Sequence, residues 1–331
     1  MKKHTLAILG AGSWGTAVAI HCARAHHNVL LWARDDQHVK DMQEQRENKR
    51  YLPGIALPPT LLPTENLTRC LKEAEHIMIA VPSHAFKTLI DAIDKNMPLS
   101  GLSWLTKGVD PKTHVFFSDI VAKRFGQDFP MAMISGPSFA NEVAREIPTA
   151  LIFAGNQIPY LLKLRDLIDS KTLRAYFSQD LIGVQLCGAV KNIVAIACGI
   201  SDGLKYGANT KAALITRGLA EMTRLGLALG AHQTTFLGLA GVGDLVLTCT
   251  DNQSRNRRFG LLLGEGRTPS EAKNQIGQVV EGQHNAAQIC DIAKQFNIEM
   301  PICNEVNAVL HGTITPYEAS KNLMERPLKD E

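Results

Sequence analysis

Short apolar runs alternate with amphipathic stretches of helical period through the first half of the chain. The runs have the length of buried strands, and stretches such as His84–Ile93 and Pro159–Ile168 repeat apolar residues every three or four positions. This α/β alternation predicts a doubly wound, mostly parallel sheet with helices on both faces. The pattern leaves open whether the last strands form an antiparallel edge. The predicted strands are Thr5–Leu9, Asn28–Trp32, His76–Val81, Leu102–Thr106, Met131–Ser135, Ala150–Ala154 and Arg174–Phe177.

The segment 48–59 interrupts this alternation. Its three prolines and Gly54 exclude a regular helix. A loop of this length inside a compact domain is usually functional or mobile. We therefore expect an irregular loop here.

The pattern changes near residue 180, where strand-like runs nearly vanish. Long stretches of helical period follow. We predict one domain over residues 1–180 and an all-helical domain over residues 181–331. The helices predicted in the second domain are Leu181–Ile200, Lys211–Leu229, Arg258–Gly264, Asn285–Phe296 and Asn304–Leu310.

The composition is that of an ordinary globular protein. The 331 residues include 35 basic and 32 acidic side chains, and the net charge of +3 gives no reason to expect nucleic acid as a partner. The seven cysteines are odd in number and form no C-x-x-C pair, so we expect reduced thiols in the cytoplasm. The histidines show no metal-binding spacing, and we expect no metal.

Two apolar segments imitate targeting or membrane signals. The basic start of the chain resembles a signal peptide, but Gly10 and the glycines after it interrupt the apolar run. The stretch Leu181–Ile200 has the length of a membrane span, yet Lys191 lies at its centre, where a lysine costs about 2.5–3.5 kcal/mol on insertion. We expect a buried core helix and no membrane span.

Gly10, Gly12 and Gly15 form a G-x-G-x-x-G sequence between the strand Thr5–Leu9 and a helical pattern over residues 16–25. Such glycines let the chain turn sharply, approach a pyrophosphate with bare backbone and pack the helix against the strand. The helix N-terminus then directs N–H groups at the phosphates. Glycine-rich turns also occur without ligands, but this setting favours a dinucleotide site in a Rossmann-type domain.

Arg34 follows the second strand, near the position where an acidic residue usually binds the ribose hydroxyls of NAD. A guanidinium there suits the 2′-phosphate of NADP, which favours NADPH. The alternative is that Arg34 is an exposed loop residue and Asp35 is the ribose acid.

Two further segments follow predicted strands, at the sheet edge where ligands of open α/β sheets bind. Lys107 and Gly108 come after the strand Leu102–Thr106, and Ser135–Ala140 leads into a helix. A serine hydroxyl and backbone N–H groups at a helix start suit an anion or a hydroxyl. The alternatives are an exposed lysine and a plain helix N-cap.

Lys191 lies in an otherwise apolar helical stretch. Because burial lowers the pKa of a lysine, its amine could exchange a proton near neutral pH. The alternative is a lysine whose amine reaches the surface from a core helix. Asp244, in a glycine-rich segment where chains can approach closely, is a possible hydrogen-bond partner that would orient Lys191.

The segment 251–258 contains three arginines among amide and hydroxyl residues. Arginine forks match phosphate geometry, whereas a charge run is more often a solvated face. No aromatic residue is interleaved, which argues against single-stranded nucleic acid. A small phosphorylated ligand is the better interpretation.

Together these motifs resemble the NAD(P)-dependent glycerol-3-phosphate dehydrogenase family in its bacterial form, over nearly the whole chain. The resemblance implies a Rossmann domain, a helical substrate domain and an active site in the cleft between them. It also implies a homodimer and reversible reduction of dihydroxyacetone phosphate to sn-glycerol 3-phosphate, which enters phospholipid synthesis. The motifs are Gly10–Thr16, Tyr51–Gly54, Ala80–Ser83, Thr106–Gly108, Ser135–Ala140, Gly188–Asn192, Gly241–Leu245, Ser254–Asn256 and Val279–Gly282.

The resemblance also implies roles for individual residues. Lys191 would be the proton donor and acceptor, with Asp244 beside it in the catalytic pair. The cofactor, NADP or NAD, would contact Ser13, Trp14, Arg34, Lys107, Ala140, Arg255, Val279 and Glu281, besides the three glycines. The substrate would contact Lys107, Gly136, Ser138, Lys191, Asp244, Ser254, Arg255 and Asn256.

Two other functions compete with this interpretation. β-Hydroxyacid dehydrogenases share the two-domain plan but resemble K-x-x-x-N at the catalytic helix, where this chain has Ala195 in the asparagine position and Asn192 beside Lys191. A non-catalytic dinucleotide sensor would need the glycine loop but not Lys191, Asp244 and the arginine cluster. A turnover assay separates these possibilities.

Overall fold

The computed structural model describes residues 3–97 and 99–327. The chain forms two compact units, one of Met1–Thr106 and Phe117–Leu181, the other of Lys107–Phe116 and Ile182–Glu331. The segment 107–116 thus belongs to the second unit, although it lies in the middle of the first unit's sequence. A single boundary near residue 180 does not describe this return of the chain.

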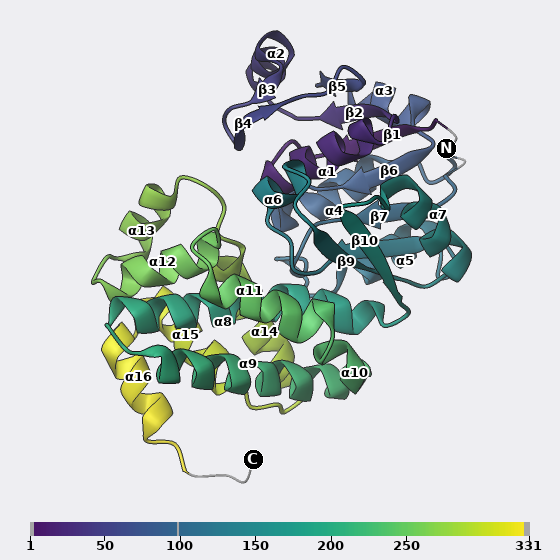
Figure 1. Ribbon diagram of the computed structural model, residues 1–331. Coiled ribbons are helices and arrows are strands. Elements are labelled where there is room, and N and C mark those ends of the chain that lie inside the picture. The colour runs from purple at the N-terminus through teal and green to yellow at the C-terminus, as the bar shows by residue number, and fades with distance from the viewer. Residues whose placement is uncertain (1–2, 98, 328–331) are drawn as a thin grey trace. The chain divides into compact units, whose positions relative to one another are not determined.

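The first unit is built on one sheet with helices packed on it (Figure 1). Its strand order is β10-β9-β8-β7-β6-β1-β2-β5. Within the described residues, β9 pairs antiparallel with β8, while the other ladders of this sheet are parallel. The last two strands therefore run against the rest, which answers the question that the sequence left open. The strands are β1 (Thr5–Leu9), β2 (Asn28–Trp32), β5 (Leu61–Thr64), β6 (His76–Ile79), β7 (Leu102–Trp104), β8 (Met131–Ser135), β9 (Thr149–Gly155) and β10 (Leu173–Ser178).

The helices of the first unit connect and cover these strands. Apolar residues from both faces of α1 are buried in the core, which extends from Leu6 on β1 to Leu173 on β10. The helices are α1 (Ser13–Arg24), α2 (Asp36–Gln45), α3 (Leu67–Glu73), α4 (Ser83–Ala92), α5 (Phe117–Phe125), α6 (Ala140–Ala144) and α7 (Ile158–Ile168).

The segment 48–59 is more regular than its sequence indicates. β4 (Leu52–Ala56) pairs antiparallel with β3 (Glu47–Asn48) in a small sheet, so the expected irregular loop is wrong over these residues. Pro53 is accommodated because each strand here has only one hydrogen-bonded neighbour in the described structure. As expected, no helix forms between residues 48 and 59.

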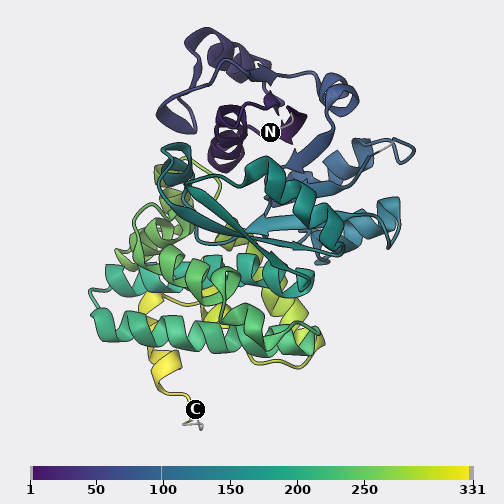
Figure 2. The ribbon, with the colours of Figure 1, turned by 45° about the vertical axis from the view of Figure 1, so that its right-hand side comes forward.

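The second unit is helical apart from the irregular segments that join its helices (Figure 2). α8 and α9 lie side by side, and Gly218 of α9 leaves space for the Val194 side chain of α8. The helices are α8 (Leu181–Gly203), α9 (Ala208–Ala228), α10 (Gln233–Phe236), the π-helical turn η1 (Leu239–Gly243), α11 (Asp244–Thr250), α12 (Arg255–Gly264), α13 (Pro269–Ile276), α14 (Glu281–Gln295), α15 (Pro301–Leu310) and α16 (Pro316–Met324).

α8 is the buried centre of the second unit. Among the described helices it alone has the length and hydropathy of a membrane span, but 89% of that window is buried within the protein, as in a core helix. α12 crosses it in backbone contact, because a Cβ on Gly199 would overlap the carbonyl oxygen of Arg257 and a Cβ on Gly260 would overlap that of Ile196. This close crossing brings the start of α12 beside the middle of α8.

Candidate active site

Lys191 and Asp244 form a buried ion pair in the second unit. Lys191 on α8 is 5% exposed and Asp244 at the start of α11 is 1% exposed. Lys191 Nζ donates a hydrogen bond to Asp244 Oδ1, and to Thr248 Oγ1 at 3.1 Å, one turn further along α11. The expected hydrogen bond is present, and the alternative in which the amine of Lys191 reaches the surface is wrong.

Lys107 donates to the other oxygen of the same carboxylate, with 3.1 Å between its Nζ and Asp244 Oδ2. Burial lowers the pKa of Lys191 to about 7; Asp244 opposes this and the charge of Lys107 adds to it. Burial acts to raise the pKa of Asp244, but the two amines outweigh it and hold that pKa below its ordinary value. An amine with a pKa near neutrality is suited to general acid–base chemistry.

The sharp turn before α11 positions Asp244. A Cβ on Gly241 would overlap the carbonyl oxygen of Phe236, and the backbone of Gly241 departs from helical angles at φ −84° and ψ −106°. The glycines of this segment therefore allow two stretches of chain to approach, as the sequence indicated, and α11 begins at Asp244.

A chain of amides joins three helices beside Lys191. Asn256 Nδ2 donates to Asn192 Oδ1 at 2.9 Å, and the backbone N–H of Gly282 donates to Asn256 Oδ1 at 2.9 Å. Asn256 of α12 is thereby held next to the Lys191 turn of α8, and α14 begins against both.

The remaining predicted residues of α12 and α14 lie in the same unit. Ser254 caps α12 by accepting a hydrogen bond from the N–H of Arg257 at 3.2 Å, and half-buried Arg255 donates to Gln278 at 3.4 Å. Burial lowers the pKa of Arg255, and the nearby charge of Glu281 opposes this. Glu281 is the first residue of α14, and Val279 is half-buried just before it.

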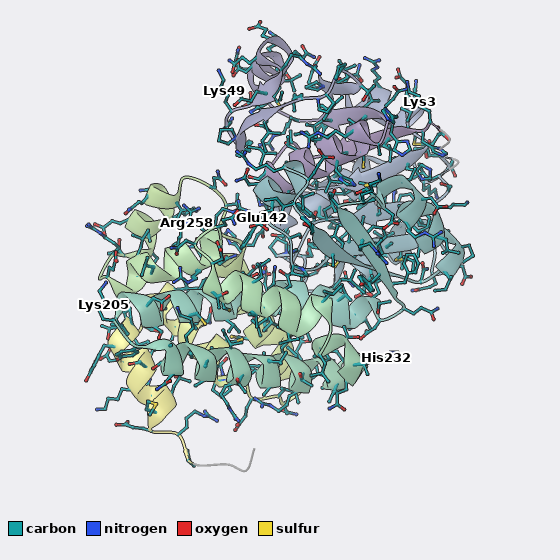
Figure 3. All side chains as sticks on the ribbon, viewed as in Figure 1. Lys3, Lys49, Glu142, Lys205, His232 and Arg258 are labelled. Carbon is teal, nitrogen blue, oxygen red and sulfur yellow. The ribbon has the colours of Figure 1, made fainter. Side chains whose placement is uncertain are left out.

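The other two arginines of the segment 251–258 differ from Arg255. Arg257 forms an ion pair with Asp202 of α8 and so ties α12 to that helix. Arg258, labelled in Figure 3, is exposed. Of the three, Arg255 is the half-buried one, and the charge of Glu281 lies near it.

The glycine loop of the first unit has the geometry of a phosphate cradle. Gly10 adopts φ +131°, and a Cβ there would lie 2.6 Å from the Ala80 backbone. A Cβ on Gly15 would overlap the carbonyl oxygen of Gly10, whereas one on Gly12 would meet no atom within 4 Å. Gly12 is also the N-cap of α1 and makes no side-chain capping hydrogen bond. The loop therefore fits a dinucleotide pyrophosphate over Gly12, at the positive end of α1.

The hairpin of β3 and β4 braces this loop. Buried Asn48 donates to the Ala11 carbonyl at 3.0 Å and to Thr16 Oγ1 at 2.8 Å, and Ser13 Oγ donates to the Tyr51 carbonyl at 2.7 Å. Trp14 is half-buried against the core, and its indole Nε1 has no partner in the described structure. Asn48 was not predicted from the sequence as part of this site.

Arg34 lies exposed directly after β2. Asp35 caps α2 by accepting from the His38 N–H at 3.1 Å and pairs with Arg50 at 3.0 Å. These two contacts hold the pKa of Asp35 below its ordinary value, with the backbone hydrogen bond acting most strongly. The Asp35 carboxylate is thus engaged by two contacts within the first unit.

The segment after β8 turns at Gly136, which has φ +117°. Ser138 Oγ donates to the Gly136 carbonyl at 3.0 Å. Because Phe139 is the N-cap of α6, the alternative that Ser138 is a plain N-cap is wrong. Ala140 is the half-buried first residue of α6.

The predicted residues thus form a group in each unit. Lys107, Lys191, Asp244 and Asn256 come together in the second unit, while the glycine loop, Arg34, Gly136, Ser138 and Ala140 belong to the first. Thr248 was not predicted from the sequence, although its four-residue spacing from Asp244 on a helix could have identified it. In the described part of the chain, no group of three or more His, Cys, Asp or Glu is arranged to hold a metal, and none of the seven cysteines forms a disulfide.

Known proteins match this chain over its whole length. Residues 5–160 match the N-terminal family model of NAD-dependent glycerol-3-phosphate dehydrogenase, and residues 180–321 match the C-terminal one. The glycerol-3-phosphate dehydrogenase (NAD(P)+) of Legionella pneumophila is 64% identical over 331 residues, all of both chains, and that of Psychromonas ingrahamii is 46% identical over 98% of each.

A solved structure agrees with these relatives. The crystal structure of glycerol-3-phosphate dehydrogenase from Coxiella burnetii is 48% identical and superposes with a TM-score of 0.94, covering 98% of this chain and 99% of that one. The chain therefore belongs to the NAD-dependent glycerol-3-phosphate dehydrogenase family in its bacterial form.

Proposed function

We propose that the chain catalyses the reversible reduction of dihydroxyacetone phosphate to sn-glycerol 3-phosphate with NADPH or NADH. The observation that carries this proposal is the buried Lys191 amine, held on Asp244 beside the start of α12. Membership of the family supplies the substrate, because its relatives carry the name glycerol-3-phosphate dehydrogenase.

In the proposed mechanism Lys191 gives a proton to the oxygen that forms at C2 of the substrate, and takes one from the C2 hydroxyl in the reverse direction. The bound nicotinamide supplies or accepts the hydride. Asp244 fixes the position of Lys191, and Thr248 accepts a second hydrogen bond from the same amine. Lys107, on the other oxygen of Asp244, helps to keep that carboxylate ionised.

Arg255 is the proposed charged contact of the substrate phosphate, with Ser254 and Asn256 as its neutral neighbours. Partial burial of the Arg255 side chain strengthens a charge-assisted hydrogen bond to phosphate. Binding energy from this remote group would orient the carbonyl, which raises the rate of the chemical step. Gly136 and Ser138 of the first unit are proposed as further substrate contacts.

The proposed cofactor site centres on Gly10, Gly12 and Gly15, where the open space over Gly12 supports the assignment. Arg34 would contact the 2′-phosphate, so that NADPH is favoured over NADH. The other proposed cofactor contacts are Ser13, Trp14, Lys107, Ala140, Arg255, Val279 and Glu281.

The biological setting is also part of the proposal. A cytoplasmic homodimer would supply sn-glycerol 3-phosphate for phospholipid synthesis, without a metal and without nucleic acid as a partner. The bacterial relatives support the activity behind this setting.

The test is to mix the purified protein with dihydroxyacetone phosphate and follow loss of absorbance with NADPH and NADH separately. Turnover with either cofactor supports the proposed reaction, and the ratio of the two rates tests the preference for NADPH. Cofactor binding without turnover would contradict the proposal. Turnover of a 3-hydroxy acid instead would favour the β-hydroxyacid dehydrogenase alternative.

A further inference from the structure

Asn285 lies between the two segments that carry the lysines of the ion-pair centre. It is fully buried, one turn into α14. Its Nδ2 donates to the carbonyl oxygen of Ala189 at 3.3 Å, two residues before Lys191 on α8. The side-chain amide is thus fixed to the helix that carries one of the two amines.

The other end of the same amide lies against the segment that carries Lys107. A Cβ built on Gly108 would lie 2.7 Å from Asn285 Oδ1, and 3.5 Å from both Cγ and Nδ2. Gly108 has φ +104°, a backbone angle that residues with a side chain rarely adopt, so this turn requires glycine. The missing Cβ also leaves space beside the turn. Asn285 occupies that space.

Asn285 Oδ1 is buried and has no hydrogen-bond partner in the described structure. A buried acceptor without a partner is costly, and such atoms are rare unless they serve a purpose. An apolar side chain of similar size would fill the same volume without this cost. The asparagine therefore points to a role that depends on its amide.

The segment 107–116 contacts α14 at a second place. His114 Nδ1 lies 3.4 Å from Asp291 Oδ2, further along the same helix. Asp110 closes the segment on itself by accepting from the Thr113 N–H at 2.9 Å and the Thr113 hydroxyl at 2.7 Å. The segment 107–116 thus packs on α14 at two places, with Asn285 beside Gly108 and Asp291 beside His114.

We infer that Asn285 is a positioning residue whose side-chain amide joins the Lys107–Gly108 turn to α8 and so holds the Lys107 amine on Asp244 beside Lys191. The inference rests on the proposed function, because it concerns the amines of that site. Asn285 would not contact the substrate. It would act by fixing the positions of the Lys107 and Lys191 amines on the Asp244 carboxylate.

This role has a consequence that a merely structural residue would lack. Lys107 lowers the pKa of Lys191, so release of the Lys107 turn raises that pKa. Oxidation of glycerol 3-phosphate needs the neutral amine of Lys191. In an Asn285 variant, the rate of glycerol 3-phosphate oxidation should therefore begin to rise at a higher pH than in the wild-type enzyme.

The experiment compares pH profiles of kcat for glycerol 3-phosphate oxidation in wild type and Asn285→Leu, which keeps the bulk but removes the amide. We expect the midpoint to move up by about half a pH unit or more, with kcat at pH 7 falling about twofold or more. Gln288→Leu is the matched control, since Gln288 is also a buried α14 amide whose oxygen has no hydrogen-bond partner in the described structure. Its profile should match wild type.

Two further variants make the test specific. In a Lys107→Met background, Asn285→Leu should cause no additional shift, because the charge that it repositions is gone. Gly108→Ala should shift the profile in the same direction, since its Cβ displaces Asn285 Oδ1; it serves as the test if Asn285→Leu fails to fold. An unchanged profile in a folded Asn285→Leu or Gly108→Ala enzyme, or an equal shift in the Lys107→Met background, would overturn the inference. Absence of turnover in wild type would instead contradict the proposed function.

Discussion

At the scale of single residues, the sequence pointed to Lys191 and Asp244 because both are charged residues among apolar or glycine-rich neighbours. That contrast is visible without a structure, since a charge in a core helix needs a partner. The pairing of Lys107 with the same carboxylate was not predicted, because contacts between residues 137 positions apart leave no local pattern. The sequence did not indicate a role for Asn285, because a buried asparagine cannot be distinguished from an exposed one by sequence alone.

Replacement of Lys191 by methionine should lower kcat by about 10²–10⁴, the usual contribution of a positioned acid–base group. Cofactor affinity should change little, because the glycine loop belongs to the other unit. Steady-state kinetics and a fluorescence titration with NADPH measure the two effects. Lys273→Met, on the exposed surface of α13, is the control and should retain full activity. A Lys191→Met enzyme within threefold of wild type would contradict the proposed role.

The pKa of Lys191, about 7, sets opposite pH dependences for the two directions of the reaction. Oxidation needs the neutral amine and should accelerate as pH rises through 7, whereas reduction needs the ammonium and should slow over the same range. Asp244 raises the pKa of Lys191, so Asp244→Asn should move both midpoints to lower pH. Profiles at saturating cofactor measure this, and parallel profiles in the two directions would exclude Lys191 as the titrating group.

Arg34 should determine the choice between the two cofactors. Loss of a charge-assisted contact to the 2′-phosphate costs about 1.5–3 kcal/mol, so Arg34→Ala should lower kcat/KM for NADPH about tenfold or more. The value for NADH, which has no such phosphate, should change little. Arg69→Ala, an exposed arginine paired with Glu73 on α3, is the control. Equal losses with both cofactors would mean that Arg34 does not distinguish them.

At the scale of elements, periodicity predicted seven of the eight strands of the main sheet and missed β5, and the glycine placement predicted the turn between β1 and α1. β1, β2 and β8 have the predicted bounds, whereas α1 begins at Ser13, before the predicted start at residue 16, so that Gly15 lies within the helix. β3 and β4 were missed because their pairing depends on contacts across the turn, and Pro53 lowers any local preference for strand. Local sequence thus predicts elements stabilised by their own pattern and misses those stabilised by neighbours.

Glu221 shows how a buried side chain can stabilise an element distant in sequence. It is 3% exposed on α9 and accepts hydrogen bonds from the N–H groups of Ile302 at 2.7 Å and Cys303 at 3.3 Å, in the first turn of α15. Burial raises the pKa of Glu221, and these two hydrogen bonds oppose it. The carboxylate therefore replaces a local cap for α15, whose N-cap Met300 offers no side-chain hydrogen bond.

Glu221→Ala should lower the free energy of unfolding by about 2–3 kcal/mol, because it leaves two buried donors without an acceptor. Urea unfolding measures this change. Glu318→Ala, which breaks the exposed capping box of α16, should cost no more than about 1 kcal/mol. If the two variants lost equal stability, Glu221 would contribute no more than a surface cap.

At the scale of the whole molecule, the sequence indicated two domains from a change in periodicity. It could not indicate that the segment 107–116 returns to the second unit. That assignment depends on burial of the segment against helices that come much later, with Val109 fully buried and Asp110 3% exposed. The chain therefore enters the second unit at residue 107, returns to the first at residue 117 and enters the second again at residue 182. A fragment that begins near residue 182 lacks the segment 107–116 and is not the whole second unit.

This predicts that a fragment of residues 182–331 is incomplete. Joining the segment 107–116 to it through a flexible Gly/Ser linker should raise its free energy of unfolding by roughly 2–4 kcal/mol, the value of burying one or two apolar side chains such as Val109 and Phe116. Urea unfolding followed by circular dichroism compares the two fragments. A linked fragment with Val109→Asp is the control, since the charged residue cannot occupy the buried position and should remove the gain. Equal stability of the linked and unlinked fragments would show that the segment is not an integral part of the helical unit. Lys107 would then belong to a loop that packs on that unit without stabilising it.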